Sequence, residues 1–188
     1  MTARFTILAF LIQFTAASAF AQQSAETKPT VLVIDSAKVS ASDFTNQNLK
    51  FLVTAAETAG QMTVFESTEH PGFKTQWHSH PHCEESFYVL EGTLTVKSGG
   101  KTYHARAGSF VYIPRGIPHG QGNFTDKPVR FVTTVTPGGI EIFFRDRDAL
   151  VKGLKPTDPA YASRLEEARQ KNKFWVHPLG TWEPDSKP

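Results

Sequence analysis

Alternating apolar and polar positions in short runs dominate the middle of the chain. Between residues 62 and 135, segments rich in β-branched and aromatic residues recur at close spacing, separated by glycine and proline turns. Glycine pairs such as Gly99-Gly100 favour hairpins, because glycine accepts the positive φ of a tight turn. Many short strands predict an all-β fold, a barrel or a double-sheet jelly roll. The expected strands are residues 62–66, 87–90, 93–96, 110–113 and 129–135.

Helical patterns follow the strands. Residues 148–151 predict a short helix that ends at Gly153, and Asp158 and Pro159 predict the cap and first turn of a second helix. We expect both short C-terminal helices to pack outside the barrel. The proline-rich tail after Trp175 is expected to be extended.

The first residues have the layout of a secretory signal peptide. Arg4 precedes an apolar stretch, and small residues at Ala19 and Ala21 suit cleavage after Ala21. The alternative is an uncleaved anchor, but the apolar stretch falls short of the roughly 20 residues that a membrane span needs. We therefore predict an exported protein, periplasmic or secreted, with no membrane attachment after cleavage.

The length of 188 residues suits one domain with a sizeable core. Residues 31–34 predict a first short strand, and residues 35–60 are weakly patterned. The predicted divisions are a signal peptide at 1–21, a segment wrapping the barrel at 22–59, a barrel at 60–145, and C-terminal helices and tail at 146–188.

Charge and cysteine content narrow the function. The net charge is +2, from 20 basic and 18 acidic residues without a run of one sign, so nothing indicates a nucleic-acid partner. Cys83 is the single cysteine, which excludes an intrachain disulfide. It is either a buried free thiol or an intermolecular link, and its position beside the histidines described next leaves a role at the site open.

Two blocks of fixed spacing carry the candidate chemistry. The first reads G-x5-H-x-H-x4-E-x6-G and the second G-x5-P-x-G-x2-H-x3-N. Side chains alternate in a strand, so the two histidines of the first block face one side. With a turn near Pro81, the glutamate can face that side too. The candidate metal ligands are His78, His80, Glu85 and His119.

Three imidazoles and one carboxylate suit a divalent transition metal: Fe, Mn, Ni, Co, Cu or Zn, one per subunit. Four protein ligands leave coordination positions open for a substrate or dioxygen. A single histidine would more often be a surface residue, but ten specified residues at matching gaps favour a metal site. His82 extends the run to three alternate histidines, although a turn after Pro81 directs it elsewhere.

These blocks resemble the two motifs of the cupin superfamily at every fixed position. Residues 84–92, 108–119 and 135–145 are also similar to the single-domain quercetin-dioxygenase-like cupins. The resemblance implies a cupin-type β-barrel, a double-stranded β-helix or jelly roll, that binds its metal through the four candidate ligands. It also implies a homodimer.

The resemblance implies a dioxygenase that cleaves an aromatic or enolisable small molecule such as a flavonol, with dioxygen as second substrate. Glu85 is the candidate catalytic residue, accepting the substrate's hydroxyl proton, for which a pKa raised by burial is expected. Predicted substrate contacts are Tyr112, Phe131 and Arg115. Other aromatic candidates to line the cavity are Phe73, Trp77, Phe87 and Phe143.

Two other classes of function remain open. The same ligands can polarise a carbonyl or activate water, which suits an isomerase, a decarboxylase or a hydrolase that does not use dioxygen. A non-catalytic exported protein that captures a metal or a small ligand is the third possibility, because no second acid–base residue stands out in the sequence.

Overall fold

Antiparallel strand pairing organises the part of the chain that the computed structural model describes, residues 31–44 and 46–182. The predicted signal peptide, residues 1–21, lies outside the described residues. The strands are β1 Ser42–Phe44, β2 Gln47–Val53, β3 Thr63–Glu69, β4 Trp77–Ser79, β5 Glu84–Glu91, β6 Thr93–Ser98, β7 Lys101–Arg106, β8 Phe110–Ile113, β9 Gly120–Gly122, β10 Val129–Thr136 and β11 His177–Gly180. The helices are a 3-10 turn, Ser36–Lys38, then α1 Glu141–Val151 and α2 Pro159–Lys171.

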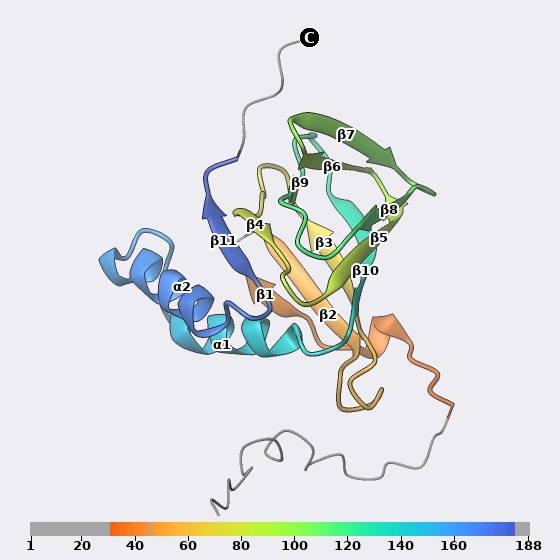
Figure 1. Ribbon diagram of the computed structural model, residues 1–188, viewed down its shortest axis with the longest axis horizontal. Helices are drawn as coiled ribbons and strands as arrows, with labels where there is room; N and C mark the ends of the chain where they lie inside the picture. The colour runs from red at the N-terminus through yellow and green to blue at the C-terminus, as the bar shows by residue number, and fades with distance from the viewer. Residues whose placement is uncertain (1–30, 45, 183–188) are drawn as a thin grey trace, which may run out of the picture. The chain divides into compact units, whose positions relative to one another are not determined.

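The strands form three antiparallel sheets (Figure 1). The largest has the order β1-β2-β3-β10-β5-β8, a second has the order β7-β6-β9, and β11 pairs with β4. Strands that are distant in sequence are neighbours, as in the pairing of β10 with both β3 and β5. This arrangement confirms the predicted all-β jelly-roll fold with two short C-terminal helices.

Period-two alternation separates an inner and an outer face of the large sheet. On β10, Phe131 is buried and its neighbour Val132 is half-buried, and on β5, Phe87 is buried while Tyr88 is 48% exposed. The inner residues meet those of β6 and β8 in an apolar core, which stabilises the barrel by removing their surface from water. This core contains Phe87, Val89, Leu94, Val96, Ala105, Ile113, Val129 and Phe131.

Helix α1 begins earlier than predicted, at Glu141 and not near residue 148. The Glu141 carboxylate ties the first turn of α1 to residues that precede and begin β3. It accepts hydrogen bonds from the Ala55 amide at 3.0 Å and the Thr63 hydroxyl at 2.6 Å. Helix α2 begins at Pro159 as expected, with Asp158 at its cap position.

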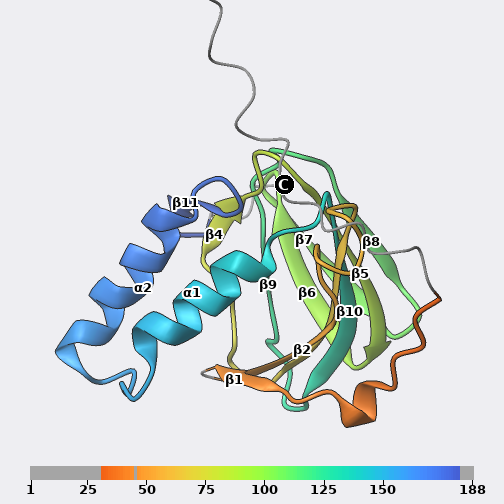
Figure 2. The same cartoon turned by 90° about the horizontal axis from the view of Figure 1, so that it is seen from below.

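The helices lie side by side outside the strands (Figure 2), and Phe44 of β1 stacks on Tyr161 of α2. Of the tail predicted to be extended after Trp175, residues 183–188 lie outside the described residues, and His177–Gly180 form β11, which pairs with β4. The strand predicted at residues 31–34 is wrong: these residues are not paired, and Val31 and Val33 are about nine-tenths exposed. High strand propensity does not make a strand without a neighbour to pack on. No helix among the described residues has the length and apolar character of a membrane span.

Candidate metal centre

Three separate segments bring the predicted ligands together. His78 lies in β4, His80 directly follows β4, and Glu85 is near the start of β5. His119 directly precedes β9 and forms an isolated antiparallel bridge with His78. The amide of each of these two histidines donates to the other's carbonyl, at 3.0 and 2.8 Å. Their side chains therefore leave adjacent backbone positions on the same side of the barrel wall.

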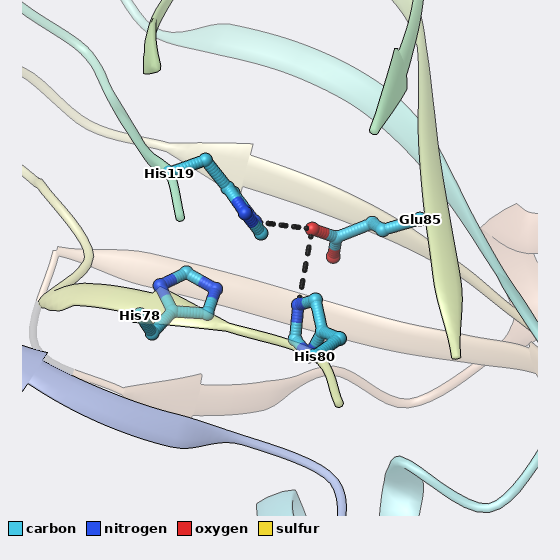
Figure 3. A group of neighbouring side chains, drawn as sticks. All are labelled: His78, His80, Glu85 and His119. Carbon is cyan, nitrogen blue, oxygen red and sulfur yellow. Dashed lines mark hydrogen bonds and ion pairs between the residues drawn. The ribbon is translucent and has the colours of Figure 1, made fainter. Parts of the chain in front are cut away.

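The four side chains converge on one point inside the barrel (Figure 3). One potential ligand atom from each of His78, His80, Glu85 and His119 lies within 4.8 Å of the other three. All four residues are at most 7% exposed. A cluster this tight and dry, with three nitrogens and one oxygen, fits a transition metal and could hold one.

Hydrogen bonds on the far side of each ring fix the orientation of the histidines. Nδ1 of His78 donates a hydrogen bond to the Gln76 carbonyl at 2.7 Å. Nδ1 of His119 donates a hydrogen bond to the Ile117 carbonyl at 2.9 Å. His80 Nδ1 donates to the Trp175 carbonyl at 2.7 Å. A carbonyl only accepts, so each Nδ1 carries the hydrogen and each Nε2 faces the cluster. This is the outer-shell arrangement that metal-binding histidines require.

Charges within the cluster are strongly coupled. Glu85 Oε2 lies 3.3 Å from His80 Nε2 and 3.1 Å from His119 Nε2. Burial lowers the pKa of His80, but the Glu85 carboxylate and the Cys83 side chain together outweigh burial and raise the pKa to about 10. Burial and the other two imidazoles hold the pKa of His78 well below its usual value. Without a metal, the cluster therefore stores one proton between His80 and Glu85.

The raised pKa predicted for Glu85 is wrong. Burial does raise it, but the charge on His80 and hydrogen bonds from His119 and His80 outweigh burial and hold the pKa well below its usual value. A carboxylate in this state is a good metal ligand and a weak proton acceptor.

The carboxyl group with a raised pKa is Glu69, which the sequence did not single out. It is fully buried on β3, and neither carboxyl oxygen has a hydrogen-bond partner of normal geometry among the described residues. Burial raises the pKa to about 8, Gln121 and Gln47 lower it in part, and Glu85 adds to the increase. Glu69 is therefore a second carboxyl group inside the barrel, held neutral near pH 7.

A cavity of about 350 Å³ opens onto the cluster. His78, His80 and Glu85 form part of its wall, and the helices form another part. Its volume suits a small organic molecule. Aromatic and aliphatic residues make much of the rest of the lining: Phe44, Phe65, Phe73, Ile140, Phe143, Phe144 and Val176.

The structure places the three predicted substrate contacts away from this cavity. Tyr112 is 54% exposed on the outer face of β8, and Phe131 is buried in the apolar core. Arg115 is exposed and pairs with Glu84 at 3.8 Å. Of the other aromatic candidates, Phe73 and Phe143 line the cavity, while Trp77 and Phe87 do not.

His82 and Cys83 lie close to the cluster in sequence, but neither belongs to it. The ring of His82 stacks on Phe174 at 4.1 Å, outside the group of four. Cys83 is a buried free thiol in a second apolar cluster with Leu49, Phe65, Val135, Ile140 and Val176. It also contacts His80 closely enough to contribute to the raised pKa of that ring. The thiol therefore borders the cluster.

The comparisons with known proteins agree on one family. Residues 65–135 match the family described as the cupin domain. The chain is 35% identical over 85 residues to polyketide synthase CurC of Streptomyces cyaneus, which is 45% of this chain and 54% of that protein. It is 30% identical over 102 residues to quercetin 2,3-dioxygenase of Bacillus subtilis (strain 168), which is 54% of this chain and 30% of that protein.

A solved structure has the same fold. The polyketide cyclase RemF from Streptomyces resistomycificus matches with a TM-score of 0.52 and 24% identity, over 57% of this chain and 80% of that one. The chain spans about a third to a half of the length of these two curated relatives. The part that matches the cupin domain, residues 65–135, contains all four side chains of the cluster. With the jelly-roll topology and the three-histidine, one-glutamate cluster, these matches show that residues 65–135 form a cupin domain.

Proposed function

We propose that this protein is a metal-dependent dioxygenase that opens an aromatic or enolisable substrate, such as a flavonol. The observation that carries the proposal is the buried cluster of His78, His80, Glu85 and His119, which forms part of the wall of an aromatic cavity. Four protein ligands leave positions for a substrate oxygen and for dioxygen. The similarity to quercetin 2,3-dioxygenase of Bacillus subtilis supports the same chemistry.

The chain's own residues hold and prepare the site. A bound divalent metal would supply Lewis-acid binding of the substrate oxygen and access for dioxygen. Glu85 acts first as a ligand, and because its pKa is low, it accepts a proton only from a hydroxyl group that binding has already made acidic. The aromatic walls exclude water and place a flat substrate beside the cluster.

An oxygen electrode tests the dioxygenase. The full chain is loaded with Fe, Mn, Co or Ni, and quercetin is added as the probe. We expect oxygen uptake in at least one metal form, none without metal, and none in a His119→Ala variant loaded in the same way. Absence of uptake in every metal form contradicts the proposal.

The second candidate is metal-dependent chemistry without dioxygen: cyclisation, isomerisation, decarboxylation or hydrolysis. Two observations favour it: the 35% identity to polyketide synthase CurC, and the neutral carboxyl group of Glu69, which does not line the cavity but interacts with Glu85, Gln47 and Gln121 of its lining. Turnover that continues under nitrogen would favour this class over the dioxygenase. Metal or ligand binding with no turnover under either gas would leave a non-catalytic binding protein.

We also propose that the protein is exported and forms a homodimer. The signal-peptide pattern supports export, which mass analysis of the N-terminus of protein recovered outside the cytoplasm would test. The outer face of β5 and β8 supports self-association, because Tyr88, Phe110 and Tyr112 are each about half exposed or more. Light scattering should show a dimer that Phe110→Asp weakens.

A further inference from the structure

Two of the four candidate ligands stand on segments that belong to different sheets. His78 lies on β4, which pairs with β11, whereas His119 directly precedes β9, which pairs with β6. Among the described residues, these two segments are joined by isolated bridges and a few hydrogen bonds, with no continuous ladder. The separation of the two imidazoles therefore depends on further contacts at this junction.

Trp182, which lies two residues after β11, contacts the first of these segments. Its Nε1 donates a hydrogen bond to the Thr75 carbonyl at 2.8 Å, in the stretch that leads into β4. Its ring centre lies 6.3 Å from that of Trp77, the residue directly before His78. The indole is therefore attached to the backbone and to a side chain of the segment that carries His78.

Gly120 shows how closely the same indole approaches the second segment, because it directly follows His119. A Cβ added to Gly120 would lie 2.8 to 2.9 Å from three atoms of the Trp182 ring, which is too close for either group to stay in place. The φ of Gly120 is not positive, so the backbone itself does not require glycine here. Glycine at this position therefore provides the space for the indole beside His119.

The chain on either side of β11 follows the ligands. The Trp175 carbonyl, before β11, orients the ring of His80. Strand β11 itself pairs with β4 beside His78 (Figure 1). Trp182, after β11, then reaches the junction with the segment of His119. Residues 175–182 thus contact the segments of all three histidines, although they lie outside the part that matches the cupin domain.

We propose that Trp182 is a positioning residue of the metal centre, which holds His78 and His119 at the spacing that one ion requires. Removing the indole leaves a gap at the junction, into which the two segments can shift. Imidazoles that are held less firmly bind an ion less tightly. This assignment rests on the proposed function only for metal binding, and it does not depend on the reaction that the metal supports.

Removal of the indole from the full chain tests the proposal. Competition with a chelator measures the affinity for Zn²⁺, and the absorption spectrum of the Co²⁺ form reports the geometry of the ligands. Trp182→Ala should bind Zn²⁺ about tenfold more weakly and alter the Co²⁺ spectrum. Trp182→Phe keeps a ring against Gly120 and should recover most of the affinity. A merely structural tryptophan would change the urea unfolding of the metal-free protein but neither metal measurement.

Gly120→Ala tests the same contact from the other segment. Its new methyl group must displace the indole, so the variant should lose Zn²⁺ affinity about as much as Trp182→Ala does. In the double variant the methyl group meets no indole, and the loss should stay close to that of Trp182→Ala alone. Leu179→Ala is the matched control: it is on β11, its side chain is 41% exposed, and it should bind Zn²⁺ like the unmodified protein.

Three results would overturn the proposal. The first is an unchanged Zn²⁺ affinity and Co²⁺ spectrum in folded Trp182→Ala. The second is a loss in the double variant that equals the sum of the two single losses. The third applies if Trp182→Ala does not fold, and it is an unchanged Zn²⁺ affinity in Gly120→Ala.

The failure of this proposal is separable from the failure of the proposed dioxygenase. A Zn²⁺ affinity that depends on Trp182, together with no oxygen uptake in any metal form, keeps the positioning role and removes the dioxygenase. Oxygen uptake with quercetin, together with a Zn²⁺ affinity that ignores Trp182, keeps the dioxygenase and removes the positioning role.

Discussion

The barrel strands and the C-terminal layer, residues 140–182, contribute to the same site in different ways. The barrel supplies all four candidate ligands, and all four fall within the part that matches the cupin family, residues 65–135. The C-terminal layer supplies no ligand of the cluster. It provides the Trp175 carbonyl that orients His80, the strand that pairs with β4, and cavity walls from both helices.

This difference explains why family resemblance indicates the chemistry better than the substrate. More than half of the residues that line the cavity lie outside residues 65–135, among them Phe44 and Arg147. Proteins that share the barrel can therefore share a metal site while their cavity walls differ. The ligands and the walls can be perturbed separately, which makes the division of labour testable.

The largest effect should come from the barrel itself. His119→Ala removes one of four ligands, and we expect the affinity for Zn²⁺ to fall by about a hundredfold or more. Equilibrium dialysis with elemental analysis measures the change. His104→Ala, an exposed histidine on β7, is the control and should bind one ion like the unmodified protein. Full occupancy in His119→Ala would show that the cluster is not the metal site.

The pH dependence of metal binding provides the next test, and it also concerns the ligands in the barrel. His80 holds a proton below its raised pKa of about 10, and a metal must displace that proton to bind Nε2. Metal affinity should therefore rise about tenfold for each pH unit between 6 and 8, with about one proton released per ion. Calorimetry in two buffers of different ionisation enthalpy counts the protons. Binding without proton release would contradict the stored proton between His80 and Glu85.

The C-terminal layer should have a smaller effect on the metal. A Cβ on Gly139 would lie 2.2 Å from the Trp175 ring, so Gly139→Ala must displace that residue, whose carbonyl orients His80. Losing an outer hydrogen bond of a ligand lowers metal affinity by about tenfold or more. Gly153→Ala is a matched control, because its φ is also positive but its Cβ would meet nothing within 4 Å. An unchanged affinity in a folded Gly139→Ala protein would remove Trp175 from the site.

The division between the barrel strands and the C-terminal layer also determines which parts of the site the sequence can predict. His78, His80 and Glu85 were predictable from local spacing, because the two histidines alternate in a strand and a turn near Pro81 places the glutamate. His119 lies 34 positions after Glu85, and the second spaced block identified it. The role of Trp175 was not predictable from the sequence, because nothing in the sequence marks a backbone carbonyl that lies 95 positions from His80.

The residues predicted as substrate contacts do not line the cavity, and for the strand residues the reason is the register of the strands. A period-two pattern identifies two faces of a strand but not which one points inward. Ile113 pairs with Glu85 and points inward, so Tyr112 points outward. Phe131 does point inward, but it lies at the apolar part of the core. Arg147 resembles an ordinary helix charge in the sequence, and only the packing against Phe44 buries it.

The smallest expected effect concerns Glu69, the second carboxyl group inside the barrel. Its folded-state pKa of about 8 exceeds the ordinary value of 4.5, so the folded protein binds this proton more tightly than the unfolded chain. The free energy of unfolding must therefore fall as pH rises from about 4.5 to about 8. Glu69→Gln removes this term, and between pH 6 and 7 its stability should fall less than that of the unmodified protein, by about 1 kcal/mol.

Urea unfolding of metal-free protein at both pH values measures the Glu69 difference. The comparison between variant and unmodified protein cancels the contributions of the other titrating groups, including His80. Glu66→Gln is the control, since Glu66 lies on the same strand and has Arg130 within 3.4 Å to pair with. Parallel pH slopes for Glu69→Gln and the unmodified protein would mean that Glu69 is ionised in the folded state. The barrel would then contain no neutral carboxyl group for proton transfer, and the candidate chemistry without dioxygen would lose one of its two supports.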